Sequence, residues 1–74
     1  MEMIRLYDVA RIYLKIIGDM ERTGDPERLA ELDEERARWH NRLIDALKRE
    51  GIPYRDREHV TWIAHNIVRL AEGP

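Results

Sequence analysis

The chain has 74 residues, with 13 lysines and arginines against 15 acidic residues and a formal net charge of −2. This length predicts a single domain spanning residues 1–74 with a thin stability margin, because so short a chain buries only about 60% of its unfolded surface. A hydrophobic content of 43% and a charged content of 38% favour a globular domain over a disordered one. The slight acidic excess argues against a protein whose main task is non-specific binding to phosphate backbones.

The chain contains no cysteine, which excludes disulfides and thiolate metal sites as sources of stability. This composition fits a cytoplasmic location. The start of the chain shows no signal-peptide pattern, and no apolar run is long enough to cross a membrane. Oligomerisation or very regular helix packing is the expected way to complete so small a core.

The first predicted helix covers residues 3–20, where polar side chains recur every three or four positions and form one stripe. These polar residues are Arg5, Asp8, Arg11, Lys15 and Asp19. Nearly all other side chains in this segment are apolar, so the apolar arc covers more than half of the helix. A surface helix usually shows an arc of little more than about 100°. Either both other helices pack against this one, or part of the arc belongs to a partner.

The second predicted helix covers residues 26–50 and has clear signals at both ends. Asp25 can cap the free backbone N–H groups, Pro26 fits the first helical position, and Glu27 suits the positive end of the helix dipole. The glycine and proline of residues 51–53 end the helix. Its predicted apolar face consists of Leu29, Leu32, Trp39, Leu43 and Leu47.

The third predicted helix covers residues 57–71 and begins after Asp56, which is a typical capping residue. Its predicted core face consists of Val60, Ile63, Ala64, Ile67 and Ala71. The three segments predict an all-α fold, a small three-helix bundle that is either self-sufficient or completed by oligomerisation.

Arg36 and His40 are out of place, because they lie one turn apart on the predicted apolar face of residues 26–50. A charge in such a place costs free energy unless it is paired. Three interpretations are open. In the first, the tips of the Arg36 and His40 side chains reach water past a short neighbouring helix. In the second, Arg36 pairs with a carboxylate such as that of Asp8. Alternatively, Arg36 and His40 form an anion-contacting pair in a groove or an interface.

Trp62 projects nearly opposite the core face of the third predicted helix, with His65, Asn66 and Arg69 beside it. Tryptophan and arginine are enriched among the residues that dominate binding at protein interfaces. Either Trp62 covers the corner at residues 52–54 and closes one end of the bundle, or these four residues form a partner-binding face.

The sequence offers no catalytic, metal or cofactor motif. It contains neither serine nor cysteine, which excludes acyl transfer through a serine or cysteine triad. The histidines His40, His59 and His65 lack metal-binding spacing, and the isolated glycines form no phosphate-cradling loop. We therefore expect no catalytic residues, no metal and no cofactor. An enzyme with a site across a dimer interface, around Arg36 and His40, is the least favoured alternative.

We predict a non-catalytic protein–protein interaction module. It would be a small regulator or inhibitor that docks on a larger protein, of the kind that phages and mobile elements encode, or a homodimeric adaptor associating through residues 3–20. The main alternative is a DNA-binding transcriptional regulator that uses the second and third helices as a helix-turn-helix. Its groove-facing residues would be Arg57, Thr61, His65, Asn66 and Arg69.

Overall fold

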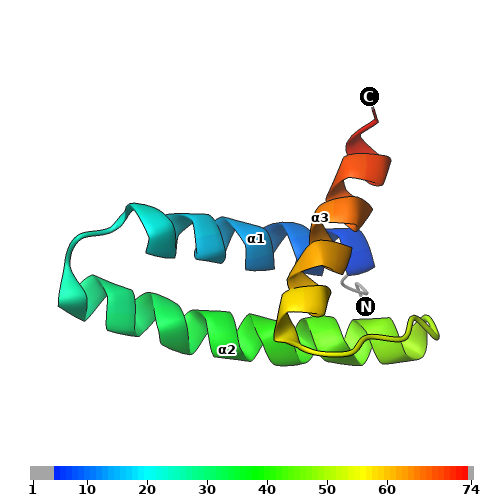
Figure 1. The fold of residues 1–74 in the computed structure, drawn as a ribbon, viewed down its shortest axis with the longest axis horizontal. Helices are drawn as coiled ribbons and strands as arrows, with labels where there is room; N and C mark the ends of the chain where they lie inside the picture. The colour runs from blue at the N-terminus through cyan, green and yellow to red at the C-terminus, as the bar shows by residue number, and fades with distance from the viewer. Residues whose placement is uncertain (1–4, 74) are drawn as a thin grey trace.

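The computed structural model describes residues 5–73, which form three α-helices. Their bounds are Leu6–Arg22 for α1, Pro26–Arg49 for α2 and Arg57–Glu72 for α3. Figure 1 shows α1 and α2 side by side as an antiparallel hairpin, with α3 lying steeply across them. The predicted all-α, three-helix fold is confirmed. No helix in this part of the chain is both long enough and apolar enough to cross a membrane.

The helix boundaries follow the predicted local signals. The Asp25 carboxylate accepts a hydrogen bond from the Glu27 backbone N–H at 3.0 Å, and Asp56 accepts one from the His59 backbone N–H at 2.8 Å. Gly51 has a φ of 70°, the left-handed conformation that glycine adopts at low cost after a helix. At the start of the chain, extended backbone at the residue before Leu6 makes α1 begin there, and the predicted start at residue 3 lies outside the described residues.

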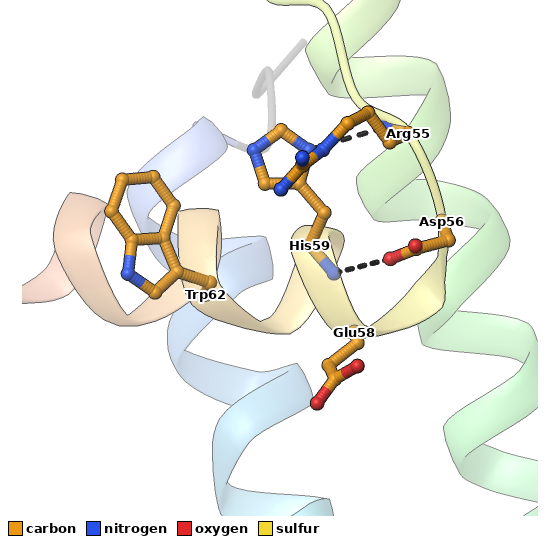
Figure 2. Close-up of a pocket in the computed structure, with 5 residues that line it drawn as sticks. All are labelled: Arg55, Asp56, Glu58, His59 and Trp62. Carbon is orange, nitrogen blue, oxygen red and sulfur yellow. Dashed lines mark hydrogen bonds between the residues drawn. The ribbon is translucent and has the colours of Figure 1, made fainter.

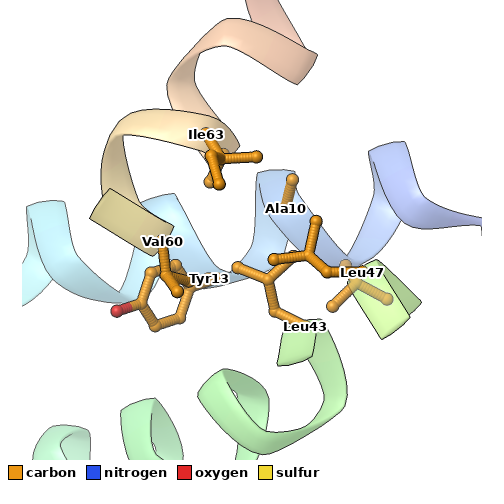
Figure 3. Packing of buried hydrophobic residues seen from close by; sticks show 8 residues of the cluster. Ala10, Tyr13, Leu43, Leu47, Val60 and Ile63 are labelled. Carbon is orange, nitrogen blue, oxygen red and sulfur yellow. The ribbon is translucent and has the colours of Figure 1, made fainter. Parts of the chain in front are cut away.

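The core lies where α1 meets the other two helices (Figure 3). Eight buried side chains form one cluster: Val9, Ala10, Tyr13, Leu43, Leu47, Val60, Ile63 and Ala64. α1 packs closely against both α2 and α3, whereas α2 and α3 contact each other only sparsely. The wide apolar arc of α1 is therefore largely explained by its two neighbours within the chain.

Two hydroxyl groups of α1 also contact α3. The Tyr7 hydroxyl donates a hydrogen bond to the Glu72 carboxylate at 2.7 Å, near the end of α3. The Tyr13 hydroxyl lies 3.3 Å from that of Thr61, near the start of α3. These bonds attach both ends of α3 to α1, so the crossing does not depend on apolar contact alone.

Three predicted core positions need correction. Leu29 is 40% exposed, because α3 crosses the hairpin near the other end of α2 and does not cover its first turns. Ala71 is exposed because the last turns of α3 rise away from the hairpin (Figure 1). Trp39 is only partly buried, at the edge of the core, and the Arg42 guanidinium lies 4.5 Å from its ring centroid.

Leu43 and Leu29 provide a matched test of this core. Leu43→Ala removes a fully buried side chain and should lower the free energy of unfolding by about 2–5 kcal/mol. Leu29→Ala, the same change on the same helix, should cost less than about half of that, because this side chain is partly in water. Urea denaturation of both variants measures the difference, and equal losses would contradict this placement of the core.

Candidate functional site

The outward side of α3 carries the most prominent exposed aromatic residue. Trp62 is 61% exposed, so the prediction that it points away from the core is confirmed. Its indole does not lie free: it stacks on the His59 imidazole, with ring centroids 5.8 Å apart and ring planes at 21° (Figure 2). The stack joins residues three positions apart on one helical face, which fixes the orientation of the indole.

The His59 ring is itself held by the backbone. Its Nδ1 atom accepts a hydrogen bond from the Arg55 backbone N–H at 3.1 Å (Figure 2). Because Nδ1 accepts in this bond, the neutral imidazole carries its proton on Nε2. The sequence analysis considered His59 only for metal binding, which its spacing does not support, and missed this role. The signal was present in the spacing, since His59 follows the Asp56 cap and precedes Trp62 by one turn.

A shallow pocket of about 430 Å³ adjoins this stack. Its lining comes from the corner before α3 and from the first turns of the helix, and consists of Arg55, Asp56, Glu58, His59 and Trp62. Figure 2 shows the indole and the imidazole side by side, with the Asp56 carboxylate capping the helix next to them. The pocket therefore combines an aromatic wall with two acidic residues and one arginine.

The other predicted residues of this face extend it along α3. The Asn66 side-chain amide donates a hydrogen bond to the Trp62 carbonyl at 2.8 Å and accepts one from the Arg69 guanidinium at 2.7 Å. His65 is exposed beside them. Leu70, which is 77% exposed and two turns beyond Trp62, adds a second apolar side chain that the sequence interpretation did not assign. We call His59, Trp62, Asn66, Arg69 and Leu70 the outer face of α3.

Arg36 pairs with the carboxylate of Asp33, and not with that of Asp8, the partner suggested from the sequence. Its side chain is only 12% exposed, and its Nε atom donates a hydrogen bond to Asp33 at 2.9 Å. The suggested partner, Asp8, lies on the exposed stripe of α1. Asp33 is one turn earlier on the same helix, where an arginine at i+3 reaches it without displacing another helix.

His40 lies partly buried against α1. Its ring centroid is 5.9 Å from that of Tyr13, and its Nε2 atom is buried with no hydrogen-bond partner among residues 5–73. Burial lowers the pKa of His40 below its ordinary value of 6.5, and the neighbouring Arg36 and Arg57 guanidinium groups lower it further. The structure thus adds a third basic group, Arg57 from α3, to the pair predicted on α2.

Comparison with known proteins gives no assignment. No protein-family model, no curated protein and no solved structure matches this chain. Within residues 5–73, no group of three or more histidine, aspartate or glutamate side chains is placed to hold a metal ion together.

The lowered pKa of His40 predicts a specific pH dependence of stability. Between the folded and unfolded pKa values the unfolded chain binds more protons, so the contribution of neutral His40 is fully present above about pH 6.5. It is lost as the pH falls through the lower, folded value. Positive charge on the ring would lose hydration through burial and would be repelled by the Arg36 and Arg57 guanidinium groups, and these effects outweigh the opposing effect of the Asn41 side chain.

Urea denaturation between about pH 7.5 and 5 should therefore show a smaller loss of stability for His40→Gln than for the unsubstituted protein. His65→Gln, a change of an exposed histidine on α3, is the control and should lose stability in parallel with the unsubstituted protein. Parallel curves for all three proteins would contradict this role of His40.

Proposed function

We propose that this chain is a non-catalytic protein–protein interaction module that docks on a larger protein through the outer face of α3. The observation that carries this proposal is Trp62, a largely exposed indole held in one orientation by the His59 ring. Exposed aromatic side chains are frequent binding anchors, and an anchor already held in place loses less conformational entropy when it binds.

The energetics support an anchor role. Burying the exposed part of an indole against a partner is worth about 2–3 kcal/mol. Leu70 offers a second exposed apolar side chain on the same side of the helix. Within residues 5–73 the other two large apolar side chains with substantial exposure, Ile12 and Leu29, are only 36% and 40% exposed and lie on other helices. The apolar surface available for binding is thus concentrated on α3.

The shape and charge of α3 indicate the kind of partner. Its last turns rise away from the hairpin, so a partner can approach the helix without meeting α2 (Figure 1). The docking mode that fits is an amphipathic helix laid into the groove of a larger protein. The pocket beside Trp62 carries mixed charge, from Asp56, Glu58 and Arg55, whereas Arg69 follows Trp62 by about two turns. We infer an apolar groove whose rim carries an acidic group near Arg69.

The DNA-binding alternative receives less support from the geometry. Arg57 and Thr61 line a pocket shared with α1 and α2, whereas Asn66 and Arg69 are hydrogen-bonded to each other on the outward side. The proposed DNA contacts therefore do not share one open face. Binding to duplex DNA at low salt that weakens steeply as salt is added would restore this alternative.

Association through α1 also remains a hypothesis. Among the large apolar side chains of α1 that the structure describes, Ile12 is the most exposed, at 36%. A dimer in sedimentation equilibrium that Ile12→Asp dissociates, and that Trp62→Ala leaves intact, would support this mode over docking through α3.

The test of the proposal is Trp62→Ala, because an exposed anchor can be removed without unfolding the chain. We expect it to lower the free energy of unfolding by less than about 1 kcal/mol, far below the 3–5 kcal/mol typical of a core tryptophan. Trp39→Ala, at the edge of the core, should cost clearly more. Thermal and urea denaturation of both variants measures this.

The binding arm uses the tagged full chain to capture a partner from its source cell. The partner is then purified and its affinity measured by calorimetry. Trp62→Ala should weaken binding about thirtyfold or more, equivalent to about 2 kcal/mol. His59→Ala should weaken it less, because the indole remains but is no longer held. The proposal fails if Trp62→Ala binds as tightly as the unsubstituted chain or melts as low as Trp39→Ala.

A further inference from the structure

A second pocket lies where α1, α2 and α3 meet, and it shares no lining residue with the pocket beside Trp62. Its volume is about 310 Å³, at the lower end of the range of about 300–1,000 Å³ that small-molecule sites occupy. Its lining combines two arginines, one carboxylate, two hydroxyls and two apolar side chains, from Arg36, Arg57, Glu21, Tyr13, Thr61, Ile17 and Met20.

The two guanidinium groups retain free donors. Arg36 uses its Nε atom for Asp33, and neither of its terminal amino groups donates to a protein acceptor within residues 5–73. The guanidinium of Arg57 makes no hydrogen bond in the same part of the chain. Two arginines from different helices thus line one pocket and have donors to spare, and guanidinium donors of this kind pair with the oxygen atoms of an oxyanion.

The rest of the pocket lining is hydrogen-bonded and partly apolar. The Thr61 hydroxyl donates to the Arg57 carbonyl at 3.1 Å, and the Tyr13 hydroxyl lies 3.3 Å from the Thr61 oxygen. These bonds tie α1 to α3 beside the pocket. Ile17 and Met20 add apolar surface from α1. Apolar surface beside paired arginines suits an anion that carries an apolar body rather than a small inorganic ion.

The charge around the pocket limits the charge of its ligand. Asp33 already offsets part of the Arg36 charge, and the Glu21 carboxylate also lines the pocket. The formal charges of Arg36, Arg57, Asp33 and Glu21 therefore cancel, and because the cost of removing an ion from water rises steeply with its charge, a single negative charge is favoured over a dianion such as phosphate.

We propose that this pocket binds a small organic carboxylate, held by the Arg36 and Arg57 guanidinium groups, with its apolar body against Ile17 and Met20. The site is independent of the docking surface on the outer face of α3. It would give the chain a small-molecule ligand in addition to a protein partner.

Benzoate is the first probe, titrated into the full chain while backbone and arginine Nε resonances are followed by NMR. Benzyl alcohol, which has a similar apolar body without the charge, and inorganic phosphate, which has charge without the body, are the comparison ligands. We expect benzoate to shift the Thr61 amide and the Arg36 Nε resonance, and to bind at least about tenfold more tightly than either comparison ligand.

Arg57→Gln is the main variant, because Arg57 is exposed on the first turn of α3 and its loss should not unfold the chain. Arg57→Gln and Arg36→Gln should each weaken benzoate binding about fivefold or more, while Arg38→Gln, the same change at an exposed position of α2, should leave it unchanged. Saturating benzoate should also raise the pKa of His40, since the bound charge offsets the two guanidinium groups.

Several results would overturn the proposal. The absence of any resonance shift at about 50 mM benzoate would overturn it, because a dissociation constant above this concentration corresponds to less than about 2 kcal/mol of binding free energy. Equal weakening by Arg38→Gln would show general charge attraction instead of a site. Tighter binding of phosphate than of benzoate would assign the pocket to a different ligand class, and equal binding of benzyl alcohol would remove the role of the arginines. None of these results depends on whether Trp62→Ala affects partner binding.

Discussion

The fold depends on α1 packing against two helices that hardly contact each other. The chain has no cysteine and only 74 residues, so its stability rests on the buried stripe of α1 and the side chains that cover it. Ala10 and Ala64, both fully buried, lie in the cluster where α3 crosses α1, and small side chains at a crossing allow two helices to approach closely. A larger residue at either position would push α3 outward and open the core.

The same crossing creates both candidate surfaces. Because α3 packs on α1 and not along α2, a space lined by Arg36, Arg57 and Tyr13 is left where the three helices meet. Because α3 stands across the hairpin, its far side is not covered by any other described helix, and Trp62 stays in water (Figure 1). In a bundle of three parallel-packed helices, more of this surface would be lost to helix contacts.

The features that could be predicted from the sequence are those that depend on residues close together in the chain, namely the helix ends and the faces of each helix. Asp25, Gly51 and Asp56 act within a few positions of the chain, and the outward direction of Trp62 follows from helical periodicity alone. What it could not predict depends on the angle of α3. The exposure of Leu29 follows from which turns of α2 are left uncovered, and the approach of Arg57 to Arg36 joins residues far apart in the chain. The Asp33 pairing was readable from the spacing, but a partner on another helix was suggested instead.

The first turns of α3 separate the two surfaces by helical geometry. Arg57 and Thr61 lie one turn apart and face the pocket with α1 and α2, whereas Trp62 lies on the outward side of the helix. Val60 and Ile63 lie between these two directions around the helix. They are buried in the core cluster with α1 and thereby set the orientation of α3 about its axis. A rotation of α3 about its axis would move Arg57 relative to the pocket and Trp62 relative to solvent at the same time. Both surfaces therefore require the same packed stripe, although they share no residue.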